Sequence, residues 1–380
     1  MNKGNNILLL GAVNVGKVKL TPFQIFSLII LFELGSAIVF SIGVEAKQDA
    51  WIAILLGMVG SILLFFVYYY LFKQFPDLTL IEYIKKILGK HLGWVVGFLY
   101  TVYFLYIAVR VLRDFEDLIV TAILPETPAF IVGLLMTLTI IYVVYHGIEV
   151  LARTGEFYFL IFLLIGLVVN FLYLVSGVID IENILPFLGE GWKPILDASF
   201  PQILTFPFGE IIVFTMLFPL LNNKKSALKV AIFGLVISGL LIAFSQMMNI
   251  AVLGVDIVER SSFPLLSSIS KIQIGDFLER LDALAVISLI VGLFFKISIF
   301  TYAGVVGASI LFKVKRYQTL LFPISMIVLG GSMSISESLA EHLDKGFAVV
   351  PDYLHLPFQI YIPLVLLVIT IIRKKYFKTL

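Results

Sequence analysis

The sequence predicts an all-α integral membrane protein, and three observations carry this prediction. Sixty per cent of the 380 residues are hydrophobic and only 14% are charged, with a mean hydropathy of +1.06. A soluble chain of this length would need a far more polar surface, whereas lipid presents an apolar one. The apolar residues also gather into ten runs of roughly 20 residues, the length that crosses about 30 Å of hydrocarbon. Finally, lysine and arginine concentrate in alternate connecting segments, as they do in polytopic membrane proteins.

The ten runs predict a single transmembrane domain over residues 20–373, with cytoplasmic tails at 1–19 and 374–380. No connecting segment is long and polar enough to form a soluble domain. In chain order the predicted spans are 20–44, 50–73, 93–113, 129–146, 154–177, 199–221, 228–253, 281–311, 317–335 and 356–373.

The basic residues predict the orientation of these spans. With the N-terminus inside, the inner segments and tails hold 18 of the 27 lysines and arginines, the outer segments hold eight, and Lys296 lies within a span. Cytoplasmic segments of membrane proteins carry an excess of these residues. Both termini are therefore predicted to be cytoplasmic.

Ten spans divide into two halves of five, about 20–177 and 199–373, whose topologies are inverted because span 1 runs outward and span 6 runs inward. Corresponding interrupted helices in two such halves indicate the binding site of a transporter. The candidates here are Gly35-Ser36-Ala37 in span 1 and Pro207-Phe208-Gly209 in span 6. Proline removes a backbone donor and glycine permits unusual backbone conformations, so both weaken a helix. We expect a ligand between these two breaks, with helix N-terminal ends turned toward an anionic group.

Glu33, Glu210 and Lys296 are charged residues inside apolar segments, where an ionisable group costs at least about 2.5–3.5 kcal/mol. Such residues commonly mark substrate or proton routes, although a carboxylate can also serve only to hydrogen-bond a neighbouring helix. We predict that Lys296 pairs with at least one of the two glutamates, because a buried lysine without a partner tends to lose its proton. The sequence does not indicate which glutamate it is. The alternative is a lone ammonium that replaces a bound cation.

Charged residues also gather at the predicted outer end of span 3. Arg110 and Asp114 are four residues apart, as are Arg113 and Asp117, which predicts ion pairs on a solvated helix end. An outer gate or a subunit contact is the alternative. Tyr103 and Tyr106, deeper in the same span, are candidates for contact with a ligand. On the inner side, residues 78–90 predict an amphipathic helix lying on the membrane surface.

Other classes of function find no support in the sequence. Residues 11–17 (GAVNVGK) match most of a phosphate-binding loop, but Val18 stands where the magnesium-binding Ser or Thr belongs and no α/β pattern follows. With no cysteine and four scattered histidines, no metal site is predicted. No catalytic grouping is found, so we expect neither an enzyme nor a cofactor, and no nucleic acid as a partner.

Four sequence stretches give the chain a family resemblance. These are KLTPFQIFSLIILFELGSAI (19–38), IEYIKKILGK (81–90), LPFLGEGWKPIL (185–196) and FPFGEIIVF (206–214). Together and in this order they resemble the endospore germination permeases, the integral B subunits of spore germinant receptors. These belong to the amino acid–polyamine–organocation superfamily, whose members share ten core helices in a LeuT-like 5+5 inverted repeat.

This resemblance implies a B-type subunit that binds a small germinant, such as an amino acid, at a midplane site. It implies interrupted helices 1 and 6 and places Lys296 opposite the helix 1 cation site. It also implies A-type and C-type receptor subunits as partners, and the spore inner membrane as the location. A proton-coupled amino-acid permease and a channel for ions or small solutes are the alternative functions.

Overall fold

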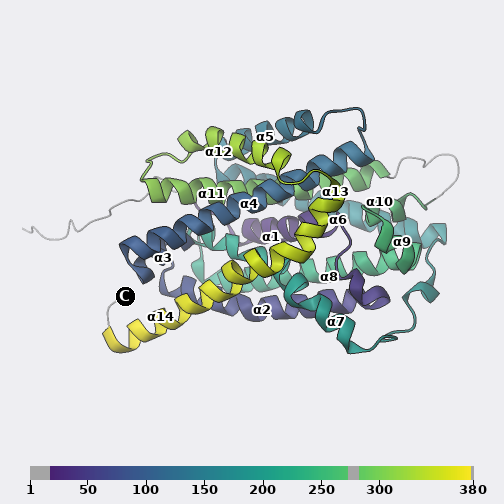
Figure 1. The fold of residues 1–380 in the computed structure, drawn as a ribbon, viewed down its shortest axis with the longest axis horizontal. Coiled ribbons are helices and arrows are strands. Elements are labelled where there is room, and N and C mark those ends of the chain that lie inside the picture. The colour runs from purple at the N-terminus through teal and green to yellow at the C-terminus, as the bar shows by residue number, and fades with distance from the viewer. Residues whose placement is uncertain (1–17, 273–281, 378–380) are drawn as a thin grey trace, which may run out of the picture.

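The computed structural model describes residues 18–272 and 282–377, and these form a membrane-protein bundle built from helices (Figure 1). The rejected phosphate-loop match at 11–17 lies outside the described residues. The α-helices are α1 (Pro22–Ala37), α2 (Ala50–Gln74), α3 (Leu80–Leu88), α4 (Lys90–Ala122), α5 (Ala129–His146), α6 (Ile148–Ser176), α7 (Trp192–Ala198), α8 (Ala227–Leu253), α9 (Val255–Arg260), α10 (Pro264–Ile269), α11 (Asp282–Phe312), α12 (Gln318–Ser334), α13 (Leu339–Asp344) and α14 (Ile362–Phe377).

Shorter 3₁₀ and π-helical pieces connect these helices. They are η1 (Val44–Asp49), η2 (Ile181–Ile184), η3 (Ser199–Ile203), η4 (Phe208–Met216), η5 (Phe218–Leu220), η6 (Lys224–Ser226), η7 (Lys345–Val349) and η8 (Pro351–Tyr361). Within residues 18–272 and 282–377 the β-structure is limited to one isolated parallel bridge, between Leu20 and Leu221.

The prediction of a polytopic helical membrane protein is confirmed. Eight helices in the described part of the chain are long and apolar enough to cross a bilayer, and a bent pair made of α12 and residues 339–349, turned by 110°, would make a ninth. Helix α1 is apolar but has only 16 residues. Each of the ten predicted spans contains helical structure, and the exact count of ten stays a prediction.

Helix α1 lies at the centre of the bundle, between α6, α8 and α11 (Figure 1). It begins with a capping box in which Thr21 and Gln24 satisfy each other's backbone donors, an arrangement that fixes where the helix starts. Nearly all of its side chains are buried. By contrast, α6 exposes large apolar residues such as Leu160, Leu167 and Phe171, as expected for a helix that faces lipid.

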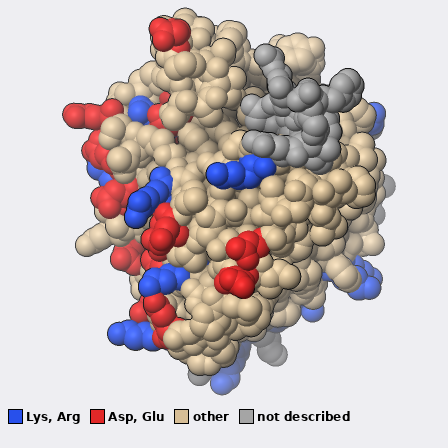
Figure 2. Space-filling model, turned by 90° about the vertical axis from the view of Figure 1, so that its right-hand side faces the viewer, with Lys and Arg blue, Asp and Glu red and all other residues tan. Residues whose placement is uncertain are grey.

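The basic segments predicted to be cytoplasmic meet at one end of the molecule. Lys374 near the end of α14 donates a hydrogen bond to Gln74 at the end of α2, and Lys224 of η6 pairs with Asp77. Helix α3 lies at this end, and α9 and α10 lie at the other (Figure 1). Figure 2 looks onto that other end, where acidic side chains gather over the left half with basic ones between them.

The prediction that α3 lies on the membrane surface is wrong. Its apolar residues Ile81, Ile84 and Ile87 are buried against the rest of the protein, and the helix packs on α4. The amphipathic pattern of this segment is real, but its apolar face covers protein core instead of lipid, which periodicity alone cannot distinguish.

Candidate functional site

The buried charges of spans 6 and 8 meet in the structure. The Nζ of Lys296 on α11 lies 2.6 Å from Oε2 of Glu210 on η4, and both side chains are buried. The same Nζ lies 5.1 Å from the ring centroid of Phe32 and 4.7 Å from that of Phe206, so the ammonium also gains cation–π attraction. The predicted pairing of Lys296 is confirmed, and its partner is Glu210.

Glu33 of α1 lies within electrostatic range of Lys296 and Glu210 but forms no ion pair with Lys296. It is fully buried, and neither carboxylate oxygen has a hydrogen-bond partner among the residues that the structure describes. One turn earlier, Ile29 fills the space left by Gly234, so this face of α1 is directed toward α8. A role of Glu33 in a substrate or proton route therefore stays a prediction.

The interruption of span 1 was expected at Gly35-Ser36-Ala37, but it begins directly after this stretch. These three residues are still helical, and the chain leaves the helix after Ala37. Gly35 serves for close packing, because a Cβ built there would lie 3.0 Å from the carbonyl oxygen of Gly292 and 3.0 Å from Cδ of Lys296. The space expected for a ligand at Gly35 is thus filled by α11.

The break in span 6 falls where the sequence predicted it. Helix α7 and η3 end before a turn at Phe206 and Pro207, and η4 begins at Phe208. A Cβ on Gly209 would overlap Oε1 of Gln359 and lie 3.0 Å from the carbonyl oxygen of Leu204. The protein's own atoms therefore also occupy the space next to this glycine.

Tyr103 of α4 is engaged by η8. Its hydroxyl is 2.8 Å from Nδ1 of His355 and accepts a hydrogen bond of 2.9 Å from Nε2 of Gln359, while its ring stacks on Phe358 at 4.7 Å. Tyr106, the other predicted ligand contact, packs with partial exposure against the hydrophobic core. The contact of either tyrosine with a ligand stays a prediction.

A cavity of about 50 Å³, here called the central cavity, extends from Glu210 toward the outer part of α4. Small-molecule sites combine apolar walls with a few polar groups. This cavity has that character. Its lining residues are Phe40, Ile107, Arg110, Val111, Asp114, Phe206, Glu210, Leu343, Gly346, Phe347, Val350 and His355. Among the predicted site residues, Glu210 lines it.

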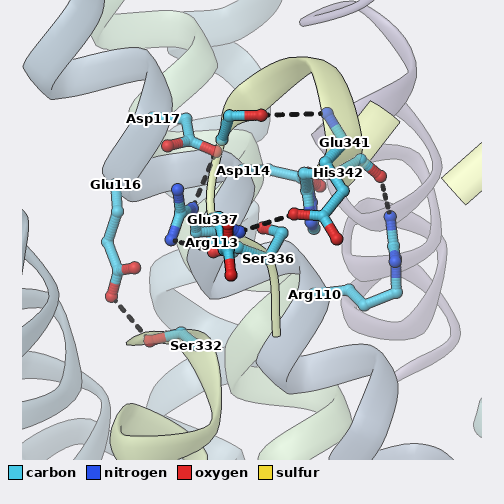
Figure 3. A network of polar contacts seen from close by, with 11 residues as sticks. Arg110, Arg113, Asp114, Glu116, Asp117, Ser332, Ser336, Glu337, Glu341 and His342 are labelled. Atoms are coloured by element: carbon cyan, nitrogen blue, oxygen red, sulfur yellow. Dashed lines mark hydrogen bonds and ion pairs between the residues drawn. The ribbon is translucent and has the colours of Figure 1, made fainter. Parts of the chain in front are cut away.

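The charged cluster on α4 is a buried network, and its prediction as a solvated helix end is wrong (Figure 3). Helix α4 continues to Ala122, so the cluster lies inside the helix, where the segment after α12 covers it. Arg110 and Asp114 are each only 8% exposed. Arg110 does not pair with Asp114; its Nη2 donates to the backbone oxygen of His342, 2.6 Å away, while Nε2 of His342 lies 2.7 Å from Oδ1 of Asp114.

The other residues of this network, on α4, contact α12 and the connection between α12 and α13. Nε of Arg113 is 2.8 Å from Oδ2 of Asp117, as the spacing predicted, and its Nη1 donates to the backbone oxygen of Ser336. Glu116, fully buried, accepts a hydrogen bond from Ser332 on α12. Polar groups of α4 thus hold the bent segment in place over the central cavity (Figure 3).

A second, outer cavity of about 500 Å³ shares three lining residues with the central one: Phe40, Leu343 and Phe347. Three carboxylates, Glu45, Glu259 and Asp344, also line it. Because the shared residues are apolar and border both spaces, they separate the central cavity from an acidic chamber at the outer end. Glu259 lies in the connection between α8 and α11. Residues 273–281 of this connection lie outside the described residues.

The sequence predicted that Lys296 pairs with Glu33 or Glu210 without deciding between them, and it missed most of the cavity lining. The sequence does indicate that Ile107, Arg110 and Asp114 lie together, because their spacing places all three on one face of a helix. His355 had no such signal, because it lies in the π-helical segment η8, which the apolar pattern does not reveal.

Comparison with known proteins identifies the family. A family model described as "Spore germination protein" matches residues 19–339. The chain is 43% identical to spore germination protein KB of Bacillus subtilis over 359 residues, which are 94% of this chain and 96% of that protein. The chain belongs to the spore germination protein family. Spore germination protein YndE of the same organism is 26% identical over 94% of this chain and 98% of its own length.

A solved transporter shares the fold. The structure of MHP1, a nucleobase-cation-symport-1 family transporter in a closed conformation with bromovinylhydantoin bound, aligns with a TM-score of 0.63 over 88% of this chain and 77% of that one, at 14% identity. The fold is therefore LeuT-like, in agreement with the superfamily that the sequence indicated. Both the family and the fold are those of receptors and transporters, and the chain is not an enzyme.

Proposed function

We propose that this chain is the B-type subunit of a spore germinant receptor and that it binds a small nutrient in the central cavity. The observation that carries the proposal is the cavity itself, where a guanidinium, two carboxylates and an imidazole converge inside an otherwise apolar bundle. Convergent polar groups in a largely apolar pocket are the usual form of a small-molecule site. The names of the relatives support germination as the process that binding triggers.

The breaks in spans 1 and 6 supply the walls of this site. Phe40 follows the end of α1, Phe206 lies in the turn of span 6, and Glu210 follows that turn. Non-helical backbone at membrane depth is tolerated where it lines a cavity or is covered by protein. A nutrient that enters through the acidic outer chamber would pass Phe40, Leu343 and Phe347 and reach Glu210.

The proposal includes A-type and C-type receptor subunits as partners and the spore inner membrane as the location, as the family resemblance implies. It places both termini in the cytoplasm, supported by the lysine-rich end at α3 and α14. Cysteines introduced at 260 and 345 are expected to react with an impermeant reagent from outside, and those at 86, 225 and 315 only after permeabilisation. Reaction from outside at 225 would contradict this orientation.

Ligand binding can be tested with the purified protein in lipid nanodiscs. A panel of the twenty L-amino acids and of hexoses is screened by thermal shift, and dissociation constants are then measured for the compounds that stabilise the protein. Ile107→Trp fills the central cavity and is expected to weaken binding at least about tenfold, because Ile107 is buried on its wall.

The matched control is Val102→Trp, which places the same side chain on the exposed face of α4 and should leave binding unchanged. Equal affinity in the Ile107→Trp variant and the unmodified protein would overturn the cavity as the site.

A proton-coupled permease is the second candidate, favoured by the transporter fold and by the buried Lys296–Glu210 pair. Uptake of the bound compound into proteoliposomes along a proton gradient would support that candidate over a sensor.

A further inference from the structure

Arg110 has a hydrogen-bond donor that the protein leaves unused. The side chain is 8% exposed and lines the central cavity. Its Nη2 donates to the backbone oxygen of His342, but its Nη1, also buried, has no hydrogen-bond partner within residues 18–272 and 282–377. A buried donor of a charged group is costly when unpaired, so this N–H indicates an acceptor that comes from outside the chain.

The surroundings hold the guanidinium in place and keep the protein's own acids away from it. A Cβ on Gly346 would overlap Nη2 of Arg110, so the glycine lets the guanidinium lie directly against the backbone of η7. Asp114, one turn along α4, uses Oδ1 for His342, and Glu210 lies 2.6 Å from Lys296. Arg110 therefore presents a fixed positive charge to the cavity without a carboxylate of the protein on its free nitrogen.

The places expected to receive an anionic group are closed. Gly35 packs on Gly292 and Lys296, and Gly209 packs on Gln359 and the backbone of Leu204. The space directly beside these two glycines thus has no room for a ligand carboxylate. In the central cavity, the positive group is Arg110, while Asp114 and Glu210 provide negative charge elsewhere on the wall.

We propose that Arg110 is the specificity-determining residue of the cavity: it binds the carboxylate of a free amino acid, whose ammonium group lies toward Asp114 and Glu210. A guanidinium suits this role because its planar array of donors matches a carboxylate. The cavity then discriminates against nutrients that lack a carboxylate. This inference rests on the proposed function, since it names the ligand class of the same site.

The test compares each amino acid that binds in the nanodisc screen with its own carboxamide, in which a neutral amide replaces the carboxylate. The unmodified protein is expected to bind the amino acid about 100-fold more tightly than the amide, the size of effect typical of a hydrogen-bonded charge. Arg110→Gln should abolish most of this preference, and Arg110→Lys should keep part of it. A residue with a purely structural role would weaken acid and amide alike, so the ratio of the two affinities is the deciding measurement.

Arg153→Gln is the control, because it removes the same charge from an exposed residue of α6 that does not line the cavity. It should leave the ratio unchanged. Equal binding of acid and amide, or an unchanged ratio in Arg110→Gln, would overturn the role of Arg110. If only hexoses bind and Ile107→Trp blocks them, the proposed function stands and this inference fails. If no compound of the panel binds, both fail.

Discussion

The Lys296–Glu210 pair and the Arg110–Asp114–His342 group are both buried and charged, yet of the two basic side chains Lys296 and Arg110 only Lys296 has an ion-pair partner among the described residues. Lys296 has a carboxylate at 2.6 Å and two aromatic rings around its ammonium. Arg110 lines the central cavity, and its Nη1 has no hydrogen-bond partner in the described part of the chain. A charge whose partners come from the protein stabilises one arrangement of helices, whereas a charge with an unused donor is available to a ligand.

The location of the two groups supports this distinction. The pair lies between α11 and the broken span 6, where α1 is packed so closely that Gly35 touches Gly292. The Arg110 group lies under a segment bent by 110°, which polar contacts with α4 help to hold in place. The first region is thus expected to respond to substitution with loss of stability, and the second with changes in access and binding.

The largest expected effect is on the stability of the inner pair. Lys296→Met leaves Glu210 as an unpaired buried carboxylate and should lower the free energy of unfolding by about 3–5 kcal/mol. Adding Glu210→Gln should recover part of this loss, whereas adding Glu33→Gln should not. Unfolding in nanodiscs or detergent, followed by intrinsic fluorescence, measures all four proteins. Equal recovery by both second substitutions would contradict a specific pair with Glu210.

The next effect concerns the contact between α1 and α11. Gly35→Ala adds a Cβ only 3.0 Å from backbone and side-chain atoms of α11, and such overpacking typically costs about 1–3 kcal/mol. Gly330→Ala is the control, since nothing lies within 4 Å of a Cβ at that position on α12. The same unfolding measurement applies. A Gly35→Ala protein as stable as the control would show that the two helices are not packed as described.

A smaller effect is expected at the boundary between the two cavities. The protein has no cysteine, so one introduced at Val111 reports access to the central cavity. Phe347→Ala removes an aromatic ring from the boundary. The cysteine should then react with a small thiol reagent from outside about tenfold faster, which corresponds to an activation barrier lower by about 1.4 kcal/mol. Phe312→Ala, at an exposed site on α11, should not change the rate. If the cysteine reacts at the same rate in the Phe347→Ala and Phe312→Ala variants, Phe347 does not form part of the boundary.

The smallest effect is expected at the surface of α6. Arg153 and Glu149 form an ion pair of 2.6 Å, with side chains 69% and 40% exposed. Exposed pairs contribute about 0–1 kcal/mol, so Glu149→Gln should change the unfolding free energy by less than roughly 0.5 kcal/mol. A loss as large as that of Lys296→Met would mean that charge alone, and not burial, sets the difference between regions.

The sequence predicted the class of fold because lipid imposes long apolar helices, and it found Lys296 and Glu210 because charges stand out in such helices. It misplaced Arg110 and Asp114, because hydropathy ended the third span at residue 113 while α4 runs to Ala122. A charge near the end of an apolar run gives the same pattern whether water or another segment covers it. The covering segment, residues 339–355, comes from the far end of the chain, and only the folded structure brings it over α4.

The central claim is that a nutrient occupies the cavity beside Arg110. The most direct test is protection of a single cysteine introduced at Val111 by the amino acid that binds most tightly in the screen. The account predicts that a saturating concentration slows the reaction of this cysteine with a small thiol reagent at least about tenfold, while a cysteine introduced at the exposed Arg260 reacts as before. An unchanged rate at position 111 under saturation would place the nutrient elsewhere and contradict the account.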